Sequence, residues 1–283
     1  MTIRMASRLA LLTLWVAAVM PPATVPAQSV LLQIRPPIGD TIRMRLSQTV
    51  EMTGTTPGAP EDASQSLTTS IDIYTRAIAR QWTSSGTLMQ SITDSVTMTP
   101  SSAASLADFR RRALQSRTSM IRVSTDGAVE VMDQDDASGE LRHLFGEMPA
   151  MLSRSVVAIG EKWTREMRIP LSGDPGAMGS VRATFQLDSL SRTGDIAFIS
   201  MKGSLSRVTL PGAVAPAAGY ETSGTLSGTI QIDRRLGWIT DSRSTIQVKS
   251  TIAASSAPKG QAQRGPMLVR TRITQWIRAM RAR

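Results

Sequence analysis

The stretch TIRMRLSQTVEM, residues 41–52, decides the fold. Its apolar side chains stand at every second position, interrupted only by Gln48, and polar or charged side chains stand between them. Alternation with period two is typical of a β-strand that has one buried and one wet face. The same period returns in VRATFQLDS (181–189) and TSGTLSGTIQID (222–233). The sequence therefore predicts a mainly β protein built from antiparallel strands.

Compact turn signals separate the alternating runs. Residues 191–195 read SRTGD, residues 233–237 read DRRLG, and Asp126-Gly127 is a typical hairpin dipeptide. Several runs between these turns are longer than the usual strand, and long strands twist and curl. We therefore expect a curved sheet, a half-barrel or a large sandwich.

Two segments have helical spacing instead. SLADFRRRALQS (105–116) begins with an N-capping serine, and SGELRHLFGEMPAMLS (138–153) places Leu141, Leu144, Phe145 and Met148 at helical intervals. Pro149 should kink or end the second helix. The prediction is two helices that cover one face or the mouth of the sheet.

A phrase of the form Ile-Gly-acid occurs twice, each time before a basic strand. PPIGDTIRMRL (36–46) and VAIGEKWTREMRI (157–169) align Gly39 with Gly160, and the elements that follow come in the same order. The interpretation is two pseudo-repeated halves. The first would span 28–137 with one helix, and the second 138–283 with the other.

The N-terminus has the form of a secretory signal peptide. Arg4 and Arg8 precede an apolar run (9–20) that is too short to span a bilayer, and small residues follow it. We expect cleavage between Ala27 and Gln28. Without a cysteine the mature chain has no residue to lipidate, so the prediction is a periplasmic or secreted protein with no lipid anchor and no later membrane span.

The chain is basic, with a formal net charge of +10. Export argues against nucleic acid as the partner, and lipid or another anionic envelope component fits better. The tail MLVRTRITQWIRAMRAR (267–283) has two interpretations. It could be an edge strand to Gln275 that its charges protect from pairing. Alternatively, it could rest on anionic lipid headgroups through Trp276, Ile277, Arg278 and Arg281.

Catalytic and metal-binding patterns are missing from the sequence. The chain has no cysteine, and its one histidine, His143, lies in the second predicted helix. The acidic run of Asp133, Asp135, Asp136 and Glu140 fails the EF-hand template, which needs glycine where Ser138 stands and glutamate where Leu144 stands. We predict a non-enzymatic protein without catalytic, cofactor or metal residues.

Four residues are candidates for facing a ligand. Trp163 and Trp238 begin strands, and Gly224 and Gly228 leave room on an apolar face. The alternatives are that the tryptophans plug the ends of the sheet and that the glycines let a helix approach. The leading hypothesis is binding of an apolar or amphipathic ligand in a β concavity. A structural or interaction protein of the envelope is the second hypothesis, and a hydrolase is the last.

Three stretches carry a resemblance to a known group of proteins. VAIGEKWTREM (157–167), LDSLSRTGDIAFISMKG (187–203) and GTIQIDRRLGWITDSRSTI (228–246) resemble an uncharacterised family of exported bacterial proteins and lipoproteins. Its members carry a Gly-acid-x-Trp phrase, a Gly-Asp turn and an Asp-x-x-x-Gly turn. The resemblance implies an envelope location and transfers no catalytic residue. This chain departs from the family by lacking a lipidated cysteine and by having Ile42 where the first tryptophan would stand.

Overall fold

A single large antiparallel sheet dominates the computed structural model, which describes residues 28–55, 65–99, 118–132, 147–170, 178–208, 220–252 and 267–280. The sheet has 12 strands in the order β7-β6-β5-β4-β3-β2-β14-β13-β12-β11-β10-β9. A separate two-stranded sheet pairs β1 with β8. The prediction of a mainly β protein with a large antiparallel sheet is confirmed.

Both parts of the chain contribute long neighbouring strands. Residues before 138 give β1 (Ser29–Val30), β2 (Thr41–Thr55), β3 (Gln65–Thr83), β4 (Gly86–Thr99), β5 (Thr118–Val123) and β6 (Val129–Val131), and β7 (Glu147–Met148) follows at the start of the second half. The second gives β8 (Val157–Ala158), β9 (Lys162–Pro170), β10 (Met178–Leu190), β11 (Ile196–Val208), β12 (Tyr220–Asp233), β13 (Trp238–Ile252) and β14 (Met267–Met280). The two parts meet where β14 pairs with β2.

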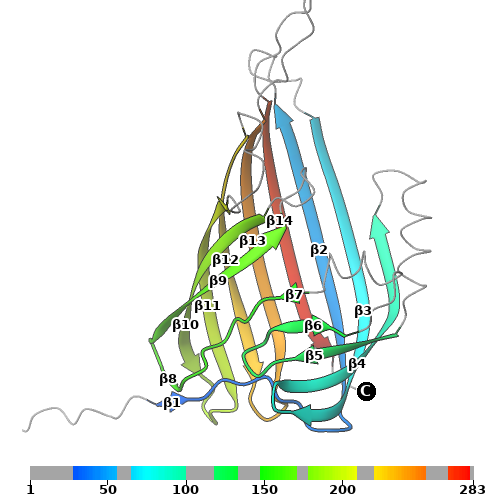
Figure 1. Cartoon of the computed structure of the whole chain (residues 1–283), viewed down its shortest axis with the longest axis vertical. Helices are drawn as coiled ribbons and strands as arrows, with labels where there is room; N and C mark the ends of the chain where they lie inside the picture. The colour runs from blue at the N-terminus through cyan, green and yellow to red at the C-terminus, as the bar shows by residue number, and fades with distance from the viewer. Residues whose placement is uncertain are drawn as a thin grey trace, which may run out of the picture.

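The sheet curls without closing (Figure 1). Its two edges are β7 and β9, and within the described residues these strands do not pair with each other. At one end of the sheet, short turns join β3 to β4, β10 to β11 and β12 to β13. We call this end the base. Strand β1 and the segment after it run across the base (Figure 1).

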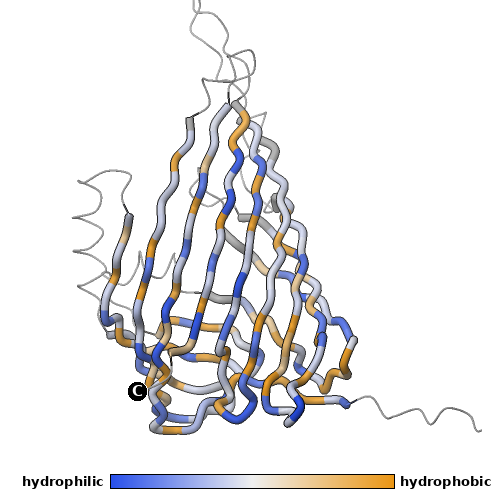
Figure 2. Tube along the Cα trace, turned by 180° about the vertical axis from the view of Figure 1, so that it is seen from behind, coloured by the Kyte–Doolittle hydropathy of each residue, from blue (hydrophilic) through white to orange (hydrophobic). Residues whose placement is uncertain are grey.

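The two faces of the sheet differ as the alternation predicts. The inner face carries the buried side chains of β10, β11 and β12, including Phe185, Ile199 and Ile230. Hydrophilic and hydrophobic residues alternate along the strands (Figure 2), and in β10 the exposed residues alternate with the buried ones. At the base, Leu32 and Ile34 from the N-terminal segment and Leu152 from the segment before β8 complete the core. These side chains exclude water from the lower inner face.

The described residues contain no helix, and the predicted second helix is wrong over residues 147–153. Residues 105–116 lie outside the described residues, as do 138–146. Residues 147–153 are described, and they form β7 and an irregular segment. Pro149 cannot donate a helical hydrogen bond. Met148 pairs with Val129, and the amides of Met151 and Leu152 donate to the Asp126 carbonyl, so tertiary contacts replace the helical ones.

The C-terminal strand also differs from the prediction. β14 continues past Gln275 to Met280 and lies in the middle of the sheet, between β2 and β13. Its charges therefore do not protect a sheet edge.

No helix in the described part of the chain is long and apolar enough to cross a membrane.

Candidate functional site

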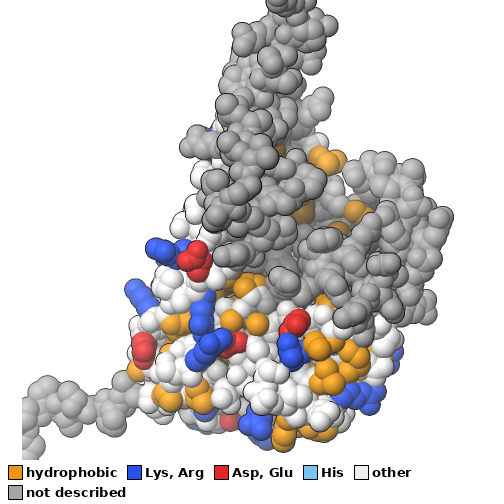
Figure 3. All heavy atoms as spheres, in the orientation of Figure 1, with side chains coloured by type: hydrophobic (Ala, Val, Ile, Leu, Met, Phe, Trp, Pro, Cys, Tyr) orange, Lys and Arg blue, Asp and Glu red, His pale blue; other side chains and the backbone are white. Residues whose placement is uncertain are grey.

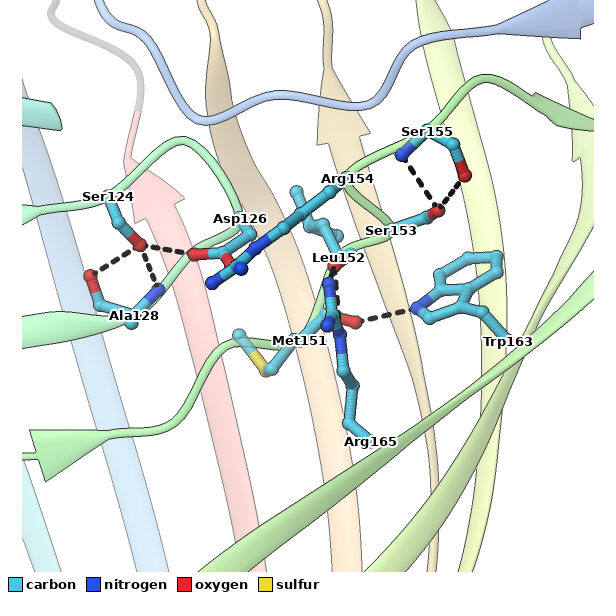
Figure 4. A network of polar contacts seen from close by, with 10 residues as sticks. All are labelled: Ser124, Asp126, Ala128, Met151, Leu152, Ser153, Arg154, Ser155, Trp163 and Arg165. Atoms are coloured by element: carbon cyan, nitrogen blue, oxygen red, sulfur yellow. Dashed lines mark hydrogen bonds and ion pairs between the residues drawn. The ribbon is translucent and has the colours of Figure 1, made fainter. Parts of the chain in front are cut away.

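A buried carboxylate joins two segments at the base. Asp126 lies in the β5–β6 turn with 5% of its surface exposed. One carboxylate oxygen accepts a hydrogen bond from the Ser124 hydroxyl, and the other accepts one from Arg154 Nε at 2.9 Å (Figure 4). The Asp126 backbone carbonyl accepts the amides of Met151 and Leu152, each at 2.9 Å. The turn thereby fastens the segment that leads from β7 to β8.

The charge state of Asp126 follows from these contacts. Burial by itself would raise the pKa of this carboxyl, because water stabilises the charged form. The hydrogen bonds from Ser124 and Arg154, the positive charge of Arg154 and the backbone amide of Ala128 outweigh burial and hold the pKa below 3.8. Asp126 is therefore ionised at neutral pH, and both of its oxygens are occupied.

The same segment is held from its other side by β9. Trp163 Nε1 donates to the Met151 carbonyl at 2.8 Å, and Arg165 Nε donates to the Leu152 carbonyl at 3.1 Å (Figure 4). The Trp163 ring stacks on Phe185, with ring centroids 5.8 Å apart. Trp163 therefore contacts the core with its ring and closes the base with its N–H group.

An open pocket of about 340 Å³ lies beside this network. The N-terminal segment, the β3–β4 turn, the β5–β6 turn and the segment before β8 line it, through Leu31, Leu32, Gln33, Ser85, Ser124, Thr125, Asp126, Ser153 and Arg154. Figure 3 shows apolar side chains interspersed with basic and acidic ones at this end of the molecule. The Asp126 carboxylate is engaged by Ser124 and Arg154, so the pocket offers no free general base. The contacts of Asp126 with Ser124 and Arg154 join the β5–β6 turn to the segment before β8.

A second feature lies farther along the inner face, away from the base. Met52 of β2 and Leu67 of β3 are direct cross-strand partners. They lie on the face that is buried near the base, yet Met52 is 37% exposed and Leu67 is 46% exposed. Their apolar neighbours on this face are only partly buried, namely Leu46, Val50, Ile71 and Ile273. We call these six residues the apolar patch.

Trp238, a predicted ligand-facing residue, lies in the core with 8% of its surface exposed. Its Nε1 donates to Met44 Sδ at 3.3 Å, which joins the start of β13 to β2. Like Trp163, it packs at the base rather than in the apolar patch.

The two predicted glycines allow close packing between neighbouring strands. A Cβ on Gly224 would lie 2.4 Å from the Gln247 carbonyl oxygen and 3.3 Å from the Leu205 side chain. A Cβ on Gly228 would lie 2.2 Å from the Arg243 carbonyl oxygen and 2.5 Å from Met201 Cε. Side chains of β11 thus occupy the space above both glycines.

The predicted lipid-contact residues fall on opposite faces of β14. Trp276 and Arg278 lie on the outer face, whereas Ile277 points to the inner face, because neighbouring residues of a strand alternate. Trp276 Nε1 donates to Asp241 Oδ2 at 2.9 Å. The guanidinium groups of Arg243 and Arg278 lie 4.8 and 5.6 Å from the ring centroid. Arg281 lies outside the described residues.

Most of the other residues singled out in the sequence lie outside the described part of the chain. Ala27, His143 and the acidic run from Asp133 to Glu140 lie outside the described residues, while Gln28 is described and its carbonyl accepts the Ile159 amide at 3.3 Å. Within the described ranges, no group of three or more His, Cys, Asp or Glu side chains could hold a metal ion.

Sequence reasoning missed both Asp126 and the pair of Met52 and Leu67. The sequence marked Asp126 only as a residue of the Asp126-Gly127 turn. No local pattern indicated that Arg154 would form an ion pair with it. The alternation around Met52 predicted the face it lies on, but period two does not report whether anything covers that face.

Comparisons with known proteins add little to this geometry. No protein-family model matches the chain, and no curated protein matches it. Among solved structures, an outer membrane channel from Pseudomonas putida F1 is similar to this chain at 11% sequence identity with a TM-score of 0.22. The match covers 86% of this chain and 96% of that one. A TM-score of this size supports no functional assignment.

Proposed function

We propose that this chain is an exported envelope protein that binds an apolar or amphipathic ligand on the inner face of its sheet, without catalysis. The observation that carries the proposal is the exposed cross-strand pair of Met52 and Leu67 on the face of the sheet that is buried nearer the base. Export is supported by the signal-like segment 1–27.

The apolar patch has the chemistry that such a ligand needs. An exposed group of large apolar side chains is unfavourable in water, and burying it releases about 25 cal/mol per Å². Gln48 lies on the same face between Leu46 and Val50, and it could hydrogen-bond a polar headgroup. A molecule with one alkyl chain and a small polar end fits this combination.

The second candidate function is a structural or interaction role in the envelope without a small ligand. It is favoured by the positions of Trp163, Trp238, Gly224 and Gly228, which serve the packing of the sheet. A protein of this kind would give no saturable binding of an alkyl-chain probe.

The test is titration of the mature protein with a fluorescent fatty-acid analogue. Leu67→Glu places a charge on the inner face, and we expect it to weaken binding by about tenfold or more, since a bound alkyl chain would leave that carboxylate without water. Ser66→Glu adds the same charge to the preceding residue, on the outer face opposite Thr53, and should bind within about twofold of the wild type. Equal binding by both variants, or no saturable binding by the wild type, would reject the proposal.

A further inference from the structure

The outer face brings cations directly opposite one another at three places. Arg270 of β14 pairs in register with Lys249 of β13. Arg278 of β14 pairs with Arg45 of β2, and Arg43 of β2 pairs with Arg76 of β3. Like charges that face each other across two strands destabilise a sheet. The three pairs therefore lower the stability of the sheet. Nothing in the packing of the fold requires a cation at these positions.

Few acids offset these charges. Asp72 pairs with Arg45 at 3.0 Å, Asp94 with Arg76 at 2.8 Å, and Asp241 with Arg243 at 3.3 Å. Among the described residues, no acid forms an ion pair with Arg43, Arg270, Arg272, Arg278 or Lys249. Glu51 faces Arg272 and Asp241 faces Arg278 in register, without an ion pair to either, so the charges of Arg43, Arg270 and Lys249 are the least offset of the five.

The unpaired cations follow one direction on the sheet. Arg270, Arg272 and Arg278 lie along β14, and Lys249 and Arg43 flank it on β13 and β2. At the usual rise of a strand, Arg270 and Arg278 are about 27 Å apart. Between them lie the Thr274 hydroxyl and Trp276. We call these five cations the basic stripe.

The character of the stripe favours a linear polymer over a membrane surface. Membrane-surface binding combines cations with apolar side chains that enter the headgroup region. Among the described residues, Met280 is the one exposed large apolar side chain on the outer face of β13, β14 and β2. Trp276 is half-buried, with its N–H bound to Asp241 and its ring beside Arg243 and Arg278. Hydroxyls and guanidinium groups instead suit carboxylates and sugar hydroxyls repeated along a chain.

We propose that the basic stripe binds a linear acidic polysaccharide, lying along β14. The bound carboxylates would neutralise the facing pairs of cations. Binding would thereby remove the charge repulsion that weakens the free sheet, and this relief would increase the affinity. This site is on the opposite face from the apolar patch, and it does not depend on ligand binding there.

The test compares binding of polygalacturonate and uncharged dextran of similar length to the full mature chain, by calorimetry at low salt. The stripe variant carries Lys249→Gln, Arg270→Gln and Arg272→Gln. The control variant carries Lys162→Gln, Arg182→Gln and Lys202→Gln, which remove the same charge from the outer face of β9, β10 and β11. Thermal unfolding of all three proteins is recorded in parallel.

We expect the wild type to bind polygalacturonate and not dextran, more weakly as salt increases. The stripe variant should bind at least tenfold more weakly and the control within about twofold. The stripe variant should unfold at a temperature similar to that of the wild type, because removing the facing pair of Lys249 and Arg270 relieves repulsion while Arg272→Gln removes the cation opposite Glu51. Equal losses of affinity in both variants would show that binding depends on net charge alone, and would overturn the proposal. Binding to anionic vesicles without binding to polygalacturonate would overturn it in favour of a membrane.

Discussion

Gly39 and Gly160 hold the same position in two turns that make the same hydrogen bonds. The Gly39 amide donates to the Ala79 carbonyl at 2.8 Å, and the Ala79 amide donates back to the Asp40 carbonyl at 3.1 Å. The Gly160 amide donates to the Leu187 carbonyl at 2.7 Å, and the Leu187 amide donates back to the Glu161 carbonyl at 3.1 Å. The φ angles are 90° and 86°. The two Ile-Gly-acid phrases thus start β2 and β9 in the same way.

Replacing either glycine by alanine should cost stability through the backbone alone. A Cβ at Gly39 or Gly160 would meet no atom within 4 Å, so the positive φ is the source of strain. We expect Gly39→Ala and Gly160→Ala each to lower the free energy of unfolding by about 1–2 kcal/mol. Chemical denaturation measures this change.

Gly54→Ala is the matched control for both variants. Gly54 also has open space around it, but it lies in β2 without a positive φ. Its replacement should be neutral or slightly stabilising. A loss at Gly54 as large as at Gly39 would contradict the backbone explanation.

Gly228→Ala should be more damaging, for a steric reason. The new Cβ would lie 2.2 Å from the Arg243 carbonyl oxygen, which belongs to the backbone of β13 and has little room to move. We expect a loss of about 1–3 kcal/mol in unfolding free energy, as for other overpacked sites. Ser227→Ala, on the outer face of the same strand, should change stability little. An unchanged Gly228→Ala protein would instead point to free space above the strand.

The sequence predicted strands and faces well because alternation is a local property. In β2, Arg43 and Glu51 lie outward and Met44 lies inward, as the pattern around TIRMRLSQTVEM indicates. Alternation does not identify the neighbouring strand, so it could not reveal that β14 lies beside β2 or that Arg278 faces Arg45. Those relations depend on contacts between residues far apart in the chain.

Competing local signals explain the error over residues 147–153. The spacing of Leu141, Leu144 and Met148 suits a helix, but local spacing carries no information about a tertiary partner. Pairing of Met148 with β6 and burial of Leu152 in the core are the contacts that the sequence could not supply. The candidate site was missed for a related reason, because exposure of Leu67 depends on what lies over it.

Export makes a direct prediction about the mature N-terminus. We expect N-terminal sequencing of protein from the periplasmic or culture fraction to begin at Gln28, since the small residues before it resemble a signal-peptidase site. Replacing Ala27 with a bulky residue should slow processing and leave a longer chain. A protein found only with Met1 intact would contradict the secretory interpretation.

The clamp at Asp126 predicts a pH dependence whose sign follows from its pKa. A carboxyl whose pKa is lower in the folded chain than in the unfolded chain stabilises the fold above the unfolded value, and this contribution is lost as pH falls through the folded value. For Asp126 the ordinary value is 3.8. Its contribution should therefore be complete at pH 7 and should disappear in the acid range below about pH 4.

Asp126→Asn isolates this contribution, because it keeps the size of the side chain while removing its charge. We expect the variant to unfold with about 1–3 kcal/mol less free energy than the wild type at pH 7, since Arg154 and Ser124 lose a charged acceptor. The difference should shrink as pH falls below 4. Asp188→Asn is the control, because Asp188 is exposed and accepts one hydrogen bond from Ser200 at 2.9 Å. Denaturation curves that stay parallel for Asp126→Asn and wild type from pH 7 to pH 3 would show that the charge of Asp126 does not stabilise the base.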